Sequence, residues 1–292
     1  MRIAGAPISW GVCEVPGWGH QMSPDRVLAE MRDTGLTATE FGPDGFLPAD
    51  PAEREALLAS YGLAAVGGFV PVVLHEPGRD PLPEVERALR GFGDAPMLVL
   101  AAVTGRDGYD ERPVLSARDW TTLLTNLDRI AAYAAGLGRR TALHPHVGTI
   151  VEGPDEVDRV LTGSGVPLCL DTGHLLIGGT DPLALARSAA DRIAHVHLKD
   201  VDASAADRVR AGRATYTEAV RDGLYRPLGT GDVDTAGIVA ALDQAGYQGW
   251  YVLEQDTVLT AEPAPGGGPV ADVRTGVAFL NGLKTVADVG GR

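Results

Sequence analysis

Four short apolar segments of the sequence end in residues that bind metals or transfer protons. They are ALHPHVG (142–148), LCLDTGH (168–174), AHVHLKD (194–200) and YVLEQD (251–256). Five of the seven histidines of the chain fall in this region, namely His144, His146, His174, His195 and His197. A set of imidazole and carboxylate groups without thiolates suits Mn²⁺, Co²⁺, Mg²⁺ or Zn²⁺, and argues against an iron–sulfur cluster or a structural zinc. The sequence therefore predicts one polar site with a divalent metal ion.

The ligand set that fits best takes one residue from each segment: His144, Asp171, His197 and Glu254. Asp171 follows His144 by 27 residues and precedes His197 by 26, whereas 57 residues separate His197 from Glu254. This spacing is expected when each ligand ends one strand of a repeated strand–helix unit, with an insertion in the last interval. Alternate strand residues share a face, so His146 lies on the same side as His144. Which of these two binds the metal stays open.

The elements that must position these residues are short apolar runs, which alternate with segments of helical period along the whole chain. Residues 202–223, after the seventh run, form an additional segment of helical character that the strand–helix alternation does not require. We expect this insertion to lie over the active-site mouth. The alternation predicts a single (β/α)8 TIM barrel domain over residues 1–292, and an open doubly wound sheet is disfavoured because no Gly-rich fingerprint follows the first run. The candidate strands are residues 3–10, 36–41, 63–70, 96–102, 140–144, 166–171, 193–198 and 250–254.

Helix starts are marked by side chains that can cap free backbone amides. Three candidate capping residues, Ser23, Asp50 and Asp181, are each followed directly by a proline. Two others, Ser116 and Asp234, precede further helical segments. Proline at the first helical position already has the required φ and needs no amide partner. These signals place a helix after most of the candidate strands, as the barrel requires.

The charge and composition limit the partners of the protein. The 292 residues carry 39 acidic and 25 basic side chains, a formal net charge of −14, and no basic cluster offsets it. Nucleic acids and anionic membranes are therefore not expected as partners. With two cysteines, no targeting segment and no apolar stretch of ~18 residues, we expect a cytoplasmic protein. Its oligomeric state is left open, with a homo-oligomer as one outcome.

Several longer motifs resemble those of the xylose isomerase-like TIM barrel superfamily, which includes sugar isomerases and epimerases. Within it the inosose dehydratases are the most similar group. The motifs cover mainly the C-terminal half, with weaker similarity at SWG (9–11) and ATEFGP (38–43). They are HPHVGT, LCLDTGHLLIGG, DRIAHVHLKDV, DRVRAGRATYTEAVRDG, GTGDVD and AGYQGWYVLEQD.

The resemblance implies one divalent metal ion, with Mn²⁺ or Co²⁺ preferred and Mg²⁺ or Zn²⁺ as alternatives, held by strands five to eight at His144, Asp171, His197 and Glu254. Many relatives have a glutamate where His144 stands. In the isomerases and epimerases that glutamate also transfers protons, so its replacement disfavours a shuttle between two glutamates. Dehydration of a keto-inositol or related keto-sugar is then the expected reaction.

This reaction needs a base for the α-hydrogen, an acid for the departing β-hydroxyl, and a metal that stabilises the enediolate. Glu254 or His146 is the expected base, and His174 or Lys199 the expected acid. An imidazole suits proton transfer near neutral pH because its ordinary pKa is about 6.5. Which group is the base and which the acid stays open. The expected substrate-binding residues are Glu40, Lys199, His146 and Trp18.

Four other functions share parts of this pattern. A metal-dependent isomerase or epimerase on a free sugar uses the same ligands, and a lyase that cleaves a keto-glycoside uses the same elimination. A DNA repair enzyme resembling endonuclease IV would need a basic face and more zinc ligands, whereas the third and fourth candidate strands end in Val70 and Ala102. A barrel that binds metal without catalysis is the fourth. The exact substrate and the native metal are not determined by the sequence.

Overall fold

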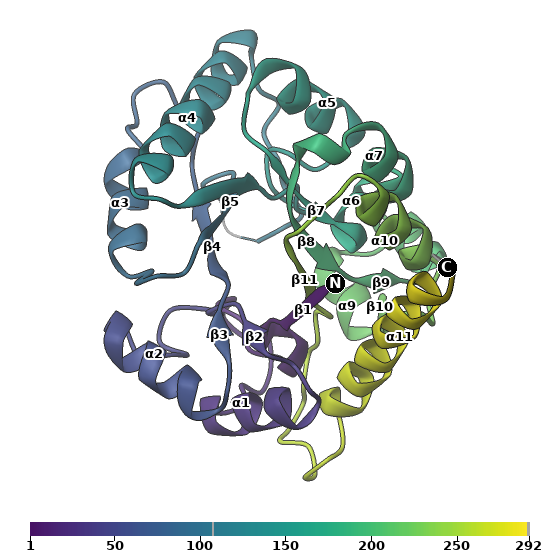
Figure 1. Ribbon diagram of the computed structural model, residues 1–292. Helices are drawn as coiled ribbons and strands as arrows, with labels where there is room; N and C mark the ends of the chain where they lie inside the picture. The colour runs from purple at the N-terminus through teal and green to yellow at the C-terminus, as the bar shows by residue number, and fades with distance from the viewer. Residues whose placement is uncertain (107, 291–292) are drawn as a thin grey trace.

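Parallel strands close into a barrel at the centre of the structure, with helices arranged around it (Figure 1). The computed structural model describes residues 1–106 and 108–290. The order of neighbouring strands is β3-β2-β1-β11-β8-β7-β6-β5-β4, and this confirms the predicted TIM barrel. The strands are β1 (Arg2–Gly5), β2 (Ala38–Thr39), β3 (Ala64–Ala65), β4 (Gly67–Val72), β5 (Met97–Ala102), β6 (Arg140–Leu143), β7 (Leu168–Asp171), β8 (Ile193–Leu198) and β11 (Trp250–Leu253).

The third barrel strand is divided at Val66, so the run expected at 63–70 appears as β3 and β4. β3 pairs with β2, and β4 pairs with β5. The amide of Val66 donates to the carbonyl of Thr39 (2.9 Å), and its carbonyl accepts from the amide of Met97 (3.2 Å). These two hydrogen bonds connect the ends of the sheet and close the barrel.

The strand predicted at residues 3–10 is too long. β1 ends at Gly5, and Pro7–Trp10 forms a short 3-10 helix, η1, because Pro7 has no amide hydrogen for strand pairing. This helix still contacts the end of the last strand. Ser9 Oγ donates to the carbonyl of Leu253 (3.4 Å) and accepts from the amide of Gln255 (3.0 Å). Both bonds position the chain on either side of Glu254.

The helices cover the outside of the barrel. The caps predicted at Asp50, Ser116, Asp181 and Asp234 all accept hydrogen bonds from amides of the following first turn, whereas the Ser23 side chain makes no such bond within the described residues. Around the barrel lie α1 (Pro24–Asp33), α2 (Pro51–Ser60), α3 (Leu82–Arg90), α4 (Ala117–Gly136), α5 (Pro154–Gly163), α6 (Thr172–Gly178), α7 (Pro182–Ser188), η2 (Ala190–Arg192), α10 (Thr235–Gln244) and α11 (Pro269–Gly290).

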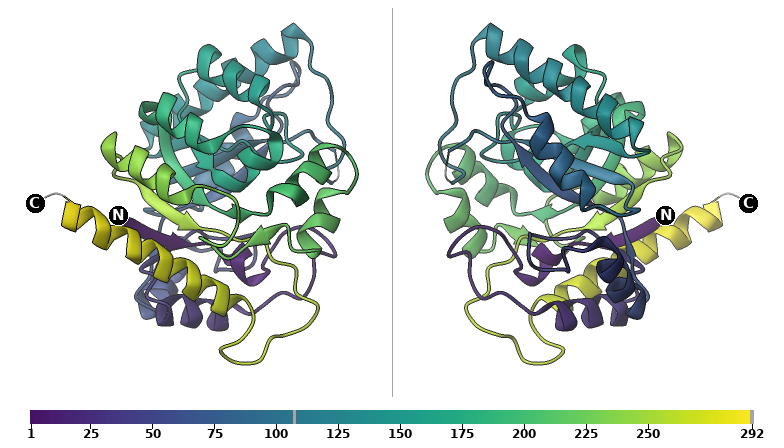
Figure 2. Two further views of the ribbon diagram at one scale, coloured as in Figure 1. Left: turned by 90° about the vertical axis from the view of Figure 1, so that its right-hand side faces the viewer. Right: turned by 90° about the vertical axis from the view of Figure 1, so that its left-hand side faces the viewer.

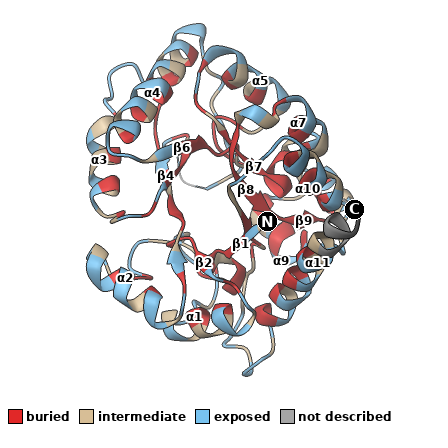
Figure 3. Cartoon of the chain, viewed as in Figure 1, coloured by how far each residue is buried: buried red, intermediate tan, exposed pale blue. Residues whose placement is uncertain are grey.

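The strands separate two apolar regions. Leu98 and Leu100 of β5 belong to the large core, whereas Met97 and Val99 pack with Ala142 in a small separate cluster. Because alternate strand residues face opposite sides, the large core lies between strands and helices and the small cluster lies inside the barrel. Figure 3 shows the buried strands and the exposed outer faces of the helices.

The segment at 202–223 forms two short helices, α8 (Ala203–Arg210) and α9 (Tyr216–Arg221), which lie at one end of the barrel in the side views of Figure 2. Two strands flank the segment, β9 (Asp200–Val201) and β10 (Tyr225–Arg226), and they pair antiparallel with each other. Among the helices of residues 1–106 and 108–290, none has both the length and the apolar composition needed to cross a membrane.

Candidate functional site

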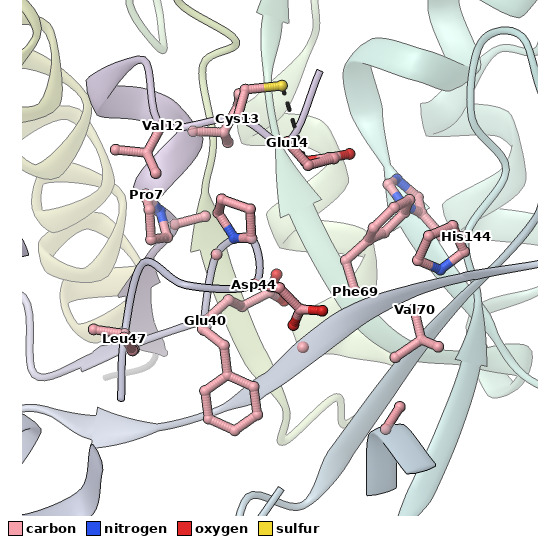
Figure 4. A pocket seen from close by; sticks show the side chains of 18 of the residues that line it. Pro7, Val12, Cys13, Glu14, Glu40, Asp44, Leu47, Phe69, Val70 and His144 are labelled. Atoms are coloured by element: carbon pink, nitrogen blue, oxygen red, sulfur yellow. Dashed lines mark hydrogen bonds between the residues drawn. The ribbon is translucent and has the colours of Figure 1, made fainter. Parts of the chain in front are cut away.

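The carboxyl ends of the barrel strands surround a pocket of about 800 Å³. Figure 4 shows Pro7, Val12 and Leu47 on one side of this pocket and Phe69 and His144 on the other. Asp171 and His174 are buried against His144. The other residues proposed from the sequence all line the pocket, namely Trp18, Glu40, His144, His146, His197, Lys199 and Glu254.

Asp171, the last residue of β7, has different partners for its two carboxylate oxygens. Oδ1 accepts hydrogen bonds from the amides of Gly173 (3.0 Å) and His174 (2.8 Å), in the first turn of α6. Oδ2 lies 3.1 Å from Nε2 of His144 and 3.5 Å from Nδ1 of His197. One oxygen thus caps a helix while the other faces two imidazoles.

The Nδ1 atom of His197 faces two carboxylates. It lies 3.2 Å from Oε2 of Glu254 and 3.5 Å from Oδ2 of Asp171, and within the described residues it makes no hydrogen bond. Ligand atoms of these three residues all lie within 4.8 Å of one another. A buried nitrogen without a hydrogen bond beside two carboxylate oxygens is a donor set that a divalent cation satisfies. The residues present therefore fit one divalent metal ion.

The other ring nitrogen of His197 is held by Glu40. Oε1 of Glu40 lies 3.0 Å from Nε2 of His197 and 2.7 Å from Nε2 of His195. Burial favours the neutral acid, but the charge of His197 and the two hydrogen bonds outweigh it and hold the pKa of Glu40 well below its usual range. A ligating histidine commonly has its second nitrogen bound to a carboxylate. Glu40 therefore contacts two histidines, and its expected contact with substrate hydroxyls remains a prediction.

Three histidines form an aromatic layer beside the carboxylates. The ring centroids of His146 and His174 lie 3.7 Å apart. The ring centroid of His144 lies 5.3 Å from that of His146 and 5.5 Å from that of His174. Burial lowers the pKa of His146 to about 3, and it holds the pKa of His174 well below its usual range. Both rings are therefore neutral near pH ~7. The acid role that the sequence suggested for His174 remains a prediction.

The orientation of His146 follows from its hydrogen bond. Its Nδ1 lies 2.7 Å from the carbonyl oxygen of Val147, which can only accept. The neutral ring therefore carries its hydrogen on Nδ1 and a lone pair on Nε2. His146 belongs to no group of candidate metal ligands among the residues described, whereas His144 groups with Asp171 and His174. This geometry favours His144 as the fourth ligand.

Lys199 lies at the centre of a buried polar network. Its ammonium group is 3.0 Å from Oε2 of Glu254 and donates a hydrogen bond to Asp256. The hydroxyl of Tyr216 donates to the other carboxylate oxygen of Asp256 (2.6 Å) and lies 2.9 Å from the hydroxyl of Tyr225. Burial alone would lower the pKa of Lys199, but the charges of Asp256 and Glu254 raise it well above the usual value. The ammonium group therefore keeps its proton.

Asp256 and Tyr216, the two pocket residues that complete the network of Lys199, were not predicted from the sequence. Asp256 follows Glu254 by two residues, so the rule that alternate residues share a face could have identified it. Tyr216 comes from α9, and strand spacing contains no information about it. Trp18 lines the pocket as well, but its Nε1 donates to the carbonyl of Thr257 (2.9 Å), so a substrate would meet only the ring.

Comparison with known proteins finds relatives whose alignments cover most of the chain. A family model of the xylose isomerase-like TIM barrel matches residues 17–282. The chain is 33% identical over 273 residues to an inosose dehydratase of Geobacillus kaustophilus (strain HTA426), an alignment that covers 88% of this chain and 87% of the relative. It is 35% identical over 269 residues to the rhizopine catabolism protein MocC of Rhizobium meliloti, covering 88% and 82%.

Solved structures with other activities share the fold. An L-ribulose 3-epimerase superposes with a TM-score of 0.69 at 18% identity, covering 100% of this chain and 98% of that one. The probable 3-DHS dehydratase AsbF of Bacillus anthracis superposes with a TM-score of 0.64 at 13% identity, covering 96% and 99%. Identities this low show the fold alone. Because an epimerase and a dehydratase share this barrel, the fold alone does not determine the reaction, which must be inferred from the residues of the site.

Proposed function

We propose that this chain, which belongs to the xylose isomerase-like TIM barrel family, is a metal-dependent lyase that dehydrates a keto-inositol or a related keto-sugar. The observation that carries the proposal is the convergence of Asp171 and Glu254 on the Nδ1 atom of His197. The inosose dehydratase relative supports the substrate class. The histidine at position 144 supports elimination over epimerisation, because a neutral imidazole stands where a second proton-transferring glutamate would be needed.

In this proposal Asp171, His197, Glu254 and His144 hold a single Mn²⁺ or Co²⁺ ion. When bound, the ion supplies positive charge that stabilises the enediolate produced when the α-proton leaves. Glu40 fixes the ring of His197 through Nε2, so that Nδ1 keeps its direction. The network around Lys199 fixes the carboxylate of Glu254 in the same way.

His146 is the proposed base. Its neutral ring lines the pocket and has its lone pair on Nε2, whereas the carboxylate of Glu254 is directed at His197 and Lys199. As His146 takes the α-proton, the C–H electron pair forms the C=C bond of the enediolate and the ketone oxygen becomes negative. When the ketone re-forms, this C=C electron pair moves to the α–β position and the β C–O bond breaks. Lys199 is the proposed donor to the departing hydroxyl, since its side chain is protonated near neutral pH and its ammonium group is positioned by Glu254 and Asp256. The hydroxyl leaves as water.

Metal removal tests the proposal directly. Treatment with a chelator followed by dialysis should abolish turnover of keto-inositol, and adding Mn²⁺ or Co²⁺ should restore it. The product should absorb in the ultraviolet and weigh one water less than the substrate. A product of unchanged mass would instead establish an isomerase or epimerase, and full activity of the metal-free protein would refute the metal requirement.

The variant Glu254→Gln tests the ligand set. It should lose both bound metal and activity, since it replaces the carboxylate oxygen that faces His197 with a neutral amide. Glu262→Gln is the matched control, because Glu262 lies in the exposed loop after β11 and contacts His20 and Arg26 instead. If Glu254→Gln kept its metal content and its turnover, Glu254 would have no part in the site.

A further inference from the structure

The pocket extends well beyond the candidate ligands. It is continuous from His144 and Glu254 to Ala88 on α3, and its volume of about 800 Å³ is large for one cyclic keto-polyol. Pockets of ~300–1,000 Å³ hold drug-sized ligands, so this pocket lies in the upper part of that range. The reacting ring therefore accounts for only a part of the space.

The far part of the pocket, here termed the outer chamber, has an apolar wall. We define the outer chamber by Phe41, Leu47, Val70, Ala88 and Phe92, all of which line the pocket. The rings of Phe41 and Phe92 meet edge to face with centroids 5.2 Å apart. By contrast, the part of the pocket near the candidate ligands is lined mainly by imidazole, carboxylate, ammonium and phenol groups, with Phe69 beside His144 and His146.

Charged groups near the outer chamber are directed elsewhere or lie at its rim. The guanidinium group of Arg54 lies over the ring of Phe41 at 4.1 Å and donates to the carbonyl groups of Gly91 and Pro48. Asp44, Glu84 and Arg87 also line the pocket. Asp44 and Arg87 are exposed to solvent, and the carboxylate of Glu84 pairs with Arg79 (3.2 Å). The wall between these groups thus offers apolar contact, and apolar surface gains free energy when a ligand removes it from water.

We infer that the substrate carries an apolar substituent, of about the size of an aromatic ring, which occupies the outer chamber while the keto ring reaches the metal site. This inference rests on the proposed function, because that function places the keto ring at His146 and Lys199. It explains why one pocket is polar at one end and apolar at the other. A free keto-polyol would leave this apolar part of the pocket unfilled.

A matched pair of substrates tests the inference. The metal-loaded enzyme is assayed with keto-inositol and with the set of its mono-O-benzyl ethers, so that every position of the substituent is sampled. We expect kcat/KM for at least one ether to exceed that of the parent by about tenfold or more. Equal or lower values for every ether would overturn the inference.

Filling the outer chamber gives an independent test. Ala88→Trp should remove the preference for the ether and leave kcat/KM for keto-inositol within about twofold. Arg90→Trp is the matched control, because Arg90 is exposed on the same helix and does not line the pocket. Should Ala88→Trp fail to fold, Ala49→Trp narrows the chamber from the exposed loop opposite α3. A preference that survives in the folded variants would refute the placement of the substituent.

Calorimetry separates failure of the inference from failure of the proposed function. If no keto compound is turned over, the proposed function fails, and the inference is then decided by binding. Tighter binding of an ether than of keto-inositol, removed by Ala88→Trp, would uphold the outer chamber as a binding site. No tighter binding of any ether would overturn it. If keto-inositol is dehydrated and no ether is preferred, the proposed function stands and the inference fails.

Discussion

Asparagine at position 171 would separate the two tasks that the oxygens of Asp171 perform. Oδ1 caps α6 through the amides of Gly173 and His174, and Oδ2 faces His144 and His197. An asparagine keeps an oxygen for the cap but presents an NH₂ group, which has no lone pair for a metal, to the imidazoles. The variant Asp171→Asn should therefore keep the helix cap and lose the metal.

The magnitudes of the two effects differ widely. Asparagine and aspartate are about equally good helix caps, so the capping part of the change should be under about 1 kcal/mol. Loss of a partner that only orients a metal ligand lowers metal affinity by about 10- to 100-fold, so loss of a ligand should exceed about 100-fold. The affinity for Mn²⁺ is measured by competition with a fluorescent chelator, and circular dichroism monitors helix content.

Asp181→Asn is the matched control for this experiment. Asp181 caps α7 with the same two bonds, from the amides of Leu183 (2.9 Å) and Ala184 (3.1 Å), and is exposed away from the site. It should change neither helix content nor metal affinity. The reasoning is refuted if Asp171→Asn binds Mn²⁺ as tightly as the wild type, or if both asparagine variants lose metal equally.

Three further predictions follow from individual side chains. Glu40→Gln should lower Mn²⁺ affinity by about 10- to 100-fold, since Glu40 holds the second nitrogen of His197; unchanged affinity in the chelator competition would contradict this. Burial lowers the pKa of His146 from 6.5 to about 3, so in metal-free protein the unfolded chain binds a proton that the folded chain does not, and stability falls as pH decreases through this interval. In urea titrations, the slope of the unfolding free energy against pH should be smaller for His146→Phe by up to roughly 1.4 kcal/mol per pH unit. An identical slope in the variant and the wild type would contradict the assignment. Burial raises the pKa of Cys13 to about 12, so iodoacetamide at pH ~8 should alkylate the folded protein at least about a hundredfold more slowly than the unfolded chain, as mass spectrometry can measure; equal rates would disprove the shift.

Much of the candidate site could be predicted because its residues obey local rules. Asp171 ends β7, His197 is the next-to-last residue of β8 and Glu254 directly follows β11. Parallel strands of a barrel bring their carboxyl ends together. The interval of one strand–helix unit between candidate ligands was therefore enough to group them. The same rule reaches Asp256, two residues beyond Glu254, although it was not applied to that residue.

Other parts of the site depend on contacts between residues far apart in the chain. Tyr216 reaches Asp256 only because the paired strands β9 and β10 bring α9 over the pocket. Glu40 lines the pocket as a substrate-binding residue would, but its contacts with His195 and His197 were not predicted from the sequence. Nothing in the sequence near Glu40 indicates these partners, which lie on the other side of the barrel.

The barrel and its candidate ligands were thus readable in the chain, because strand period, helix caps and unit spacing are local properties of sequence. The early end of β1 follows from Pro7, which the sequence already contains. The division of the third strand at Val66 was decided instead by tertiary pairing, since it depends on which backbone groups find partners. The preference for His144 over His146, and the apolar outer chamber, are likewise properties of packing. They arise from side-chain directions and enclosed volume, which exist only once distant segments of the chain have come together.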